Sequence, residues 1–205
     1  IVLLSSSIIS PTTNEIINQF KKEYNSSHVV YDPVSSSGIL DANKIMFGLR
    51  KLPTYRFDLS ETIVSFDADF LGDWLDSGHG RDYAKNRNPE NKTMSTHFQF
   101  ESILSLTGAN ADFRSPVKAS KIGEALVNLY NIIALKSNNK IYDVNRSPNQ
   151  EMLTKAANSL WKNRGKSILV SGINDVNIQL IVNKINQILG NYDKTINLSN
   201  FSNLK

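Results

Sequence analysis

Apolar residues follow two patterns along the chain. Short continuous apolar runs are typical of buried strands, and apolar positions three or four residues apart are typical of helices. The runs predict strands over residues 1–7, 28–33, 62–70, part of 96–108, 167–172 and 195–199. The helical spacing predicts helices over residues 14–24, 39–47, 81–85, 121–135, 149–163 and 175–189. Residues 51–60 and 108–120 carry turn residues and are expected to be connecting segments.

Strands and helices alternate at the start of the chain, which favours parallel strands joined by right-handed crossovers. We therefore predict an α/β protein with a parallel sheet. The chain of 205 residues is expected to form one α/β domain over residues 1–205, and the polar stretch 137–148 is the best candidate for a boundary between lobes. Because Ile1 already lies in an apolar run, we expect the chain to be a piece of a longer protein.

Composition excludes several kinds of site. The chain has no cysteine, so within it there is no disulfide, no thiolate nucleophile and no cysteine-bound zinc or iron–sulfur cluster. No apolar run approaches the roughly 20 residues of a membrane helix, so no direct membrane insertion is expected. The net charge of +4 is mild, and the densest basic cluster (Arg81, Lys85, Arg87) includes Asp82. We expect these residues to form a solvent-exposed basic surface, and we expect no nucleic-acid partner.

The chemistry of the chain centres on residues 63–72, where an apolar run ends in Asp67 and Asp69. In α/β sheets, ligands bind at the carboxyl edge of the strands, so a site is expected there. An aspartate-nucleophile phosphohydrolase and a metal-dependent nucleotide-sugar transferase both use such a pair of aspartates. Leu71 stands where the phosphohydrolases have a small residue, and no later pair of acids completes a magnesium site. The remaining alternative is structural: one aspartate caps the turn and the other faces solvent.

Other candidate residues give weaker signals. His28, His79 and His97 lack metal-ligand spacing, so we expect lone surface or edge histidines and no metal site. The chain has neither a Gly-x-Gly-x-x-Gly motif nor a P-loop. Serines after the first two predicted strands (residues 5–7 and 35–37) could offer hydroxyl and amide groups to an anion, although such runs are more often plain loops.

Several segments together resemble one family. The chain is similar to the molybdopterin-oxidoreductase-like part of the large iron–sulfur subunit of bacterial alternative complex III, a quinol-oxidising membrane assembly. The resemblance rests on YDPVSSSGILDANKIMFG, LPTYRFDLSETIVSFDADFLGDW and MSTHFQFESILSLTGANADFRSPVKAS. Within the last of these, ANADFRSPVKAS resembles the AD-x-W-L-P-I-R-P-G segment of molybdopterin oxidoreductases, and KSILVSGINDVNIQLIVNKINQILGNYDKTI resembles their strand, helix and LLGN turn. The matches cover nearly the whole chain in the same order.

The resemblance implies a Rossmann-like, dinucleotide-binding-type core. It also implies a parent subunit on the periplasmic side of the inner membrane, with cytochrome and membrane subunits as partners. Iron–sulfur clusters would lie in a separate cysteine-rich domain of that subunit. In this branch of the family the domain carries no molybdenum cofactor, so the implied role is a non-catalytic scaffold in an electron-transfer complex.

Two departures from the family concern the cofactor site. Asp67-Ala68-Asp69 stands where cofactor-binding relatives have a Gly-Ser-Asn-Pro-like turn, and two carboxylates would repel the phosphates of a pterin dinucleotide. The R-P-G turn is replaced by residues 117–120, which lack its glycine. The alternative is an oxidoreductase fragment that still binds molybdopterin guanine dinucleotide. The vestigial candidates for such a site are Ser6, Ser7, Asp67, Asp69, Thr107, Gly108, Asn110 and Asp112.

Overall fold

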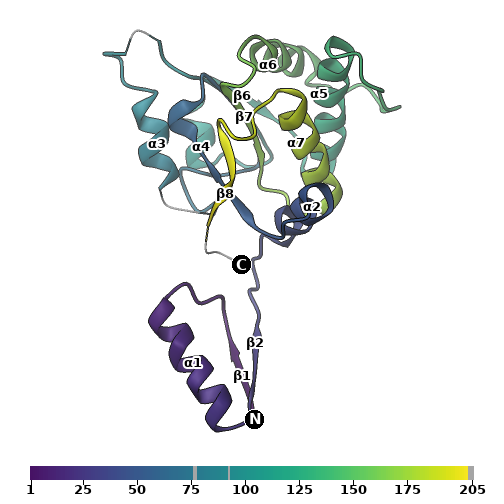
Figure 1. Cartoon of the computed structure of the whole chain (residues 1–205). Helices are drawn as coiled ribbons and strands as arrows, with labels where there is room; N and C mark the ends of the chain where they lie inside the picture. The colour runs from purple at the N-terminus through teal and green to yellow at the C-terminus, as the bar shows by residue number, and fades with distance from the viewer. Residues whose placement is uncertain (76–77, 92, 203–205) are drawn as a thin grey trace.

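A four-stranded parallel sheet forms the centre of the computed structural model, which describes residues 1–75, 78–91 and 93–202 (Figure 1). Its strands lie in the order β6 (Phe113–Pro116), β5 (Thr96–Glu101), β4 (Thr62–Phe66) and β7 (Ser167–Ser171). Every residue of β4 and β7 is buried, as expected for a sheet covered on both faces. The prediction of an α/β protein with a parallel, Rossmann-like sheet is confirmed.

Helices cover the sheet (Figure 1). On one side, α5 (Ile122–Lys136), α6 (Gln150–Lys162) and α7 (Val176–Ile188) bury aliphatic side chains against Val64, Phe98 and Leu169. A second cluster of buried side chains is rich in aromatic rings. It includes Phe57, Phe70 and Tyr83, and Tyr83 lies in α3 (His79–Lys85). The helix α2 (Ser37–Phe47) packs against α7. These layers leave the carboxyl ends of the strands as the open edge of the sheet.

The prediction of a plain connector over residues 51–60 was wrong. These residues form β3 (Leu52–Tyr55) and the 3-10 turn Phe57–Leu59, and β3 pairs antiparallel with β8 (Ile196–Ser202). Pro53 interrupts the apolar pattern by which a strand is recognised in a sequence. Proline is nevertheless tolerated in an edge strand, and the neighbouring Leu52 is buried.

Residues 108–120 are not a plain loop either. They contain the end of the short helix α4 (Leu106–Ala109) and the edge strand β6. The sequence of β6 is Phe-Arg-Ser-Pro, which carries no apolar run, so pairing with β5 rather than local pattern makes it a strand.

The first 34 residues form a sheet and helix outside the main body (Figure 1), and the loop after β1 faces that body across a pocket. They form β1 (Val2–Ser5), α1 (Pro11–Glu23) and β2 (Ser27–Val30), with β1 and β2 paired in parallel as a sheet of their own. The parallel crossover was predicted, but α1 begins three residues earlier than expected. Ser10 caps it by accepting a hydrogen bond from the Thr13 amide, and Pro11 suits the first turn.

Residues 137–149 connect α5 to α6, and these two helices pack against each other. The proposed lobe boundary at 137–148 falls on this connection and stays a prediction, as does the single-domain assignment. Within the described ranges, no helix has the length and apolarity needed to cross a membrane.

Candidate functional site

A pocket of about 510 Å³ opens at the carboxyl end of β4. It lies between the loop after β1, the segment leading into α2, the turn after β4 and the turn after β7. Four of the predicted site residues line it: Ser6, Ser7, Asp67 and Asp69. The other lining residues include Asp32, Ser35, Ser36, Asp73, Trp74 and Asn174. The pocket therefore lies at the carboxyl edge of the sheet, where the sequence predicts a site.

Asp67 begins the turn after β4 in a left-handed conformation, with φ of 51°. Its carboxylate accepts a hydrogen bond from the Ser102 amide at 2.8 Å and another from the Ser102 hydroxyl at 3.3 Å. Burial raises the pKa of this carboxyl, and the two bonds from Ser102 act against that rise. The Asp67 carbonyl also lies so close to Gly172 that a Cβ there would be 2.1 Å from the carbonyl oxygen.

Asp69 is held by the helix turn that follows β5. Its Oδ1 atom accepts hydrogen bonds from the Thr107 amide at 2.9 Å and the Thr107 hydroxyl at 2.7 Å. The Thr107 hydroxyl oxygen accepts from the Leu71 amide at 2.9 Å, which ties the two loops together. The structural alternative expected one aspartate to cap the following turn and the other to face solvent. Instead, both carboxylates accept hydrogen bonds from the segment after β5.

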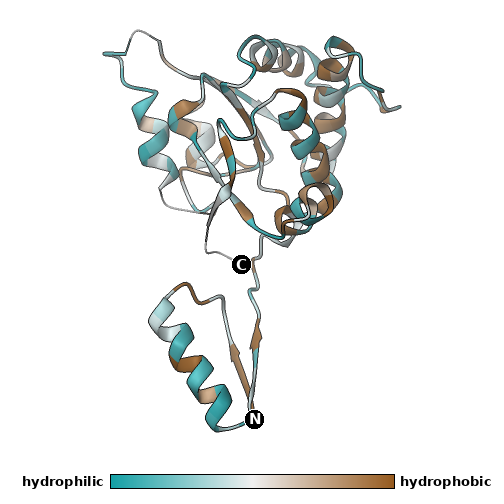
Figure 2. Cartoon of the chain, viewed as in Figure 1, coloured by the Kyte–Doolittle hydropathy of each residue, from teal (hydrophilic) through white to brown (hydrophobic). Residues whose placement is uncertain are grey.

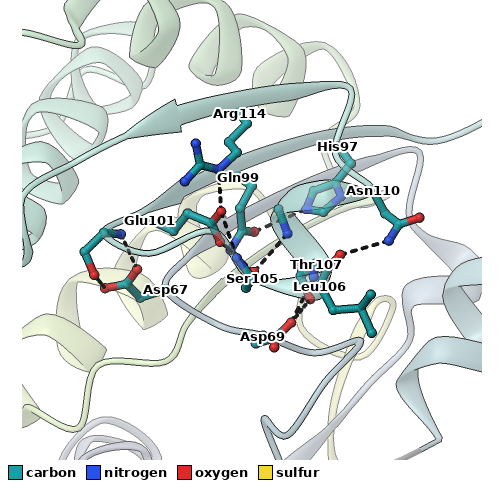
Figure 3. A network of polar contacts seen from close by, with 12 residues as sticks. Asp67, Asp69, His97, Gln99, Glu101, Ser105, Leu106, Thr107, Asn110 and Arg114 are labelled. Atoms are coloured by element: carbon teal, nitrogen blue, oxygen red, sulfur yellow. Dashed lines mark hydrogen bonds and ion pairs between the residues drawn. The ribbon is translucent and has the colours of Figure 1, made fainter.

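Glu101 is a third carboxylate at this edge, and the sequence reading missed it (Figure 3). Its side chain is 1% exposed and pairs with Arg114 at 2.5 Å. It accepts hydrogen bonds from the Ser105 hydroxyl at 2.6 Å and the Gln99 amide at 3.1 Å. Burial alone would raise the pKa of Glu101, but its hydrogen bonds from Ser105, Arg114 and Gln99 outweigh this and lower it. Gly108 packs on the carboxylate, since a Cβ there would be 1.9 Å from Oε1.

The network continues into the core through His97 (Figure 3). Since the Gln99 amide group donates to Glu101, its carbonyl faces His97, and Nε2 of His97 donates to it at 3.3 Å. The Nδ1 atom lies 3.2 Å from the oxygen of the Tyr83 hydroxyl, which donates to the Asn110 carbonyl at 3.1 Å. Burial lowers the pKa of His97 to about 4. The imidazole is therefore neutral, with its proton on Nε2.

The expectation of lone surface or edge histidines was wrong for His79 and His97, which are 7% and 0% exposed. Both lie in the aromatic cluster around Phe57 and Phe70. Apolar rings fill the space around an imidazole well, and the surrounding partners satisfy the nitrogens of His97, so burial is favourable.

The other four predicted site residues divide into two groups. Thr107 and Gly108 contact the carboxylates described above. Asn110 and Asp112 lie away from the pocket: the Asn110 side chain donates to the Leu106 carbonyl, and Asp112 pairs with Arg87 at 2.6 Å. Asp112 also accepts from the His97 amide. These two residues fix the end of α4 and the start of β5.

The charge of the pocket is negative. Asp32, Asp67, Asp69 and Asp73 line it, and none of its described lining residues is a lysine or an arginine. The Ser7 hydroxyl and the Ser7 amide both donate to Asp32 and lower its pKa. The carboxylates do not converge on a metal site: over residues 1–75, 78–91 and 93–202, no three His, Asp or Glu side chains form a group that could hold a metal ion.

A signal for the missed residues was present in the sequence. In β5, polar His97, Gln99 and Glu101 alternate with Phe98 and Phe100. Such alternation in a strand with solvent on one side would expose the polar residues. In a sheet covered on both faces, it predicts a buried polar row that needs internal partners.

Comparisons with known proteins bear on the fold. No family model matches the chain, and no curated protein matches it. A solved structure of acetylene hydratase from Pelobacter acetylenicus is similar, with a TM-score of 0.57 and 11% identity over 96% of this chain. The formyltransferase/hydrolase complex from Methylorubrum extorquens, solved with methylofuran, is also similar, with a TM-score of 0.55 and 12% identity over 93% of this chain.

The matched region is only part of those proteins. This chain spans 30% of the acetylene hydratase chain and 50% of the matched chain of the formyltransferase/hydrolase complex. At these identities the comparisons establish a shared fold.

Proposed function

We propose that this chain is a non-catalytic scaffold domain with a molybdopterin-oxidoreductase-like fold. The likeness in fold to acetylene hydratase, a molybdopterin enzyme, supports the superfamily. The site geometry supports the loss of the cofactor. What carries the proposal is the pair of hydrogen bonds from the Thr107 amide and hydroxyl to Asp69.

Backbone amides at the start of a helix, together with nearby hydroxyl groups, are the usual partners of a ligand phosphate. Here the chain's own carboxylates take those partners. Asp69 accepts from Thr107, Asp67 accepts from the Ser102 amide, and Glu101 accepts from Ser105. A phosphate group would have to displace them.

The pocket beyond these carboxylates is also unsuited to a dinucleotide. It presents four aspartates and, among its described lining residues, no cationic side chain. Each close contact between like charges costs on the order of 1 kcal/mol even in water. The residues present therefore do not fit a guanine dinucleotide.

We further propose the assembly in which the scaffold works. The resemblance to the large subunit of alternative complex III supports a place on the periplasmic side of the inner membrane. Cytochrome and membrane subunits would be the partners, and iron–sulfur clusters would lie elsewhere in the parent subunit. The second candidate is an oxidoreductase fragment that binds molybdopterin guanine dinucleotide, and the position of the pocket at the carboxyl edge of the sheet favours it.

A thermal-shift titration with GDP, GTP and molybdopterin guanine dinucleotide tests the proposal. A ligand at 100 times its dissociation constant adds about 2.7 kcal/mol to stability, so binding is readily seen. The scaffold proposal expects no shift for the natural chain. The Asp67→Asn/Asp69→Asn variant keeps the shape of the pocket with two fewer charges, and it is the matched comparison.

A shift that appears only in the Asn variant would mean that the carboxylates exclude the dinucleotide, which supports the proposal. A saturating shift in the natural chain that Ser7→Ala or Thr107→Val weakens would overturn it and establish the second candidate. Metal analysis of the parent assembly gives an independent readout: the scaffold proposal expects iron without molybdenum.

A further inference from the structure

One face of the sheet formed by β1 and β2 is bare. Parallel register pairs Val2 with Ser27 and Leu4 with Val29, so these side chains share a face, and Tyr31 continues the alternation. Val2 is 65% exposed, Leu4 66% and Tyr31 65%. On the other face, Leu3 and His28 are partly covered, and α1 lies on that side (Figure 1). We call Val2, Leu4, Val29 and Tyr31 the bare face.

The N-terminal unit has almost no core of its own. Ile17 is its one buried apolar side chain among the described residues. Of the large apolar side chains that are exposed, as many come from residues 1–34 as from the rest of the described chain. The apolar colour of both strands is visible in Figure 2. This concentration distinguishes the unit from a surface with scattered apolar residues.

Physical chemistry disfavours such a unit standing alone. Parallel sheets are normally covered on both faces, and a two-stranded sheet is marginal in water. The edges are also unprotected: β1 reads Val-Leu-Leu-Ser and β2 reads Ser-His-Val-Val, with no lysine, arginine, aspartate, glutamate or proline to discourage association. We therefore expect another uncharged apolar surface to cover the bare face.

We propose that the bare face packs against the same face of a second copy of the chain, about a two-fold axis. The four side chains expose on the order of 400 Å², which is about half of the roughly 800 Å² that each partner contributes to a standard interface. The face carries no charge, so two copies meet without like-charge repulsion. Sheets packed in this way lie about 10 Å apart, with α1 on each outer side.

The molar mass of the purified chain across a concentration series, measured by light scattering, tests the proposal. The natural chain is expected to be a dimer, and Leu4→Lys is expected to raise the dissociation constant at least about tenfold, because a lysine at the centre of the interface must be desolvated. The matched control is Ile103→Lys, whose natural side chain is 80% exposed in the main body. This variant should dimerise normally.

Leu4→Lys could also prevent dimerisation by unfolding β1, so a second variant tests the interface without adding a charge. Since the chain has no cysteine, Leu4→Cys places a single thiol on the bare face, and a short bismaleimide should join two copies of it but not two copies of Ile103→Cys. A monomeric natural chain at all concentrations would overturn the proposal, including the case in which the face instead takes a strand of another protein. A dimer that survives both Leu4→Lys and Tyr31→Lys would overturn it as well.

Discussion

The carboxylate of Asp69 accepts two hydrogen bonds from one residue, Thr107, which lies 38 positions further along the chain. This contact fastens the turn after β4 to the first turn of α4. A carboxylate therefore stands at the edge of the sheet where dinucleotide-binding folds present groups to a phosphate. The polar network at the carboxyl edge of the sheet leads to four predictions that can be measured.

Replacing Thr107 with valine keeps the shape of the side chain but removes its hydroxyl. Asp69 then loses a donor, and the Leu71 amide loses its acceptor in a buried place. We expect a loss of about 1–3 kcal/mol in the free energy of unfolding, measured by urea denaturation. Thr107→Ser keeps the hydroxyl and should recover most of the loss. A Thr107→Val variant as stable as the natural chain, or one less destabilised than Thr107→Ser, would contradict the role of the hydroxyl.

Gly108 and Gly80 form a matched pair for alanine substitution. A Cβ at Gly108 would lie 1.9 Å from Glu101 Oε1, whereas one at Gly80 would have Leu71 Cδ2, 3.8 Å away, as its nearest neighbour. Gly108→Ala must therefore displace a buried carboxylate, and we expect about 2–4 kcal/mol of destabilisation. Gly80→Ala lies in α3 and should be neutral or stabilising by up to about 1 kcal/mol. Thermal melts of the two variants check this order.

The ion pair of Arg114 with Glu101 should matter far more than an exposed pair. Arg114→Met leaves Glu101, whose side chain is 1% exposed, without its cation. Because Arg114 itself is partly in solvent, the expected loss is about 1–3 kcal/mol, below that of a fully buried pair. Lys166→Met breaks the exposed pair with Glu61 and should cost under about 0.5 kcal/mol. Comparable losses from the two variants, by urea denaturation, would contradict the burial argument.

His97 makes the fold sensitive to mild acid. Burial holds its pKa at about 4, below the ordinary 6.5, so the unfolded chain binds a proton in this interval that the folded chain does not. The contribution of neutral His97 to the free energy of unfolding is fully present above pH 6.5. As the pH falls towards 4, this free energy decreases by up to about 3 kcal/mol. His97→Gln should flatten the dependence of the unfolding free energy on pH between 7 and 4.5. An unchanged slope would mean that another group is responsible.

The fold was largely predictable because β4 and β7 are continuous apolar runs and the long helices are regularly striped. The edge elements β3 and β6 were not predictable, since their strand state depends on pairing with β8 and β5 rather than on local pattern. The same limit applies to the site. Asp67 and Asp69 stand out after an apolar run, whereas Glu101 looks like a surface residue until the sheet is known to be covered on both faces.

The antiparallel pairing of β3 with β8 brings Leu52 opposite Ser202, so the first residue of β3 and the last residue of β8 lie side by side. A stretching force applied at these two positions would act across the ladder and open its hydrogen bonds one after another, as in unzipping, instead of shearing them together. The four-stranded sheet lies outside this load path. The resistance to a force between these two positions is therefore set first by a short edge ladder, and such a force would detach β8 before it disturbed the edge that holds Asp67 and Asp69.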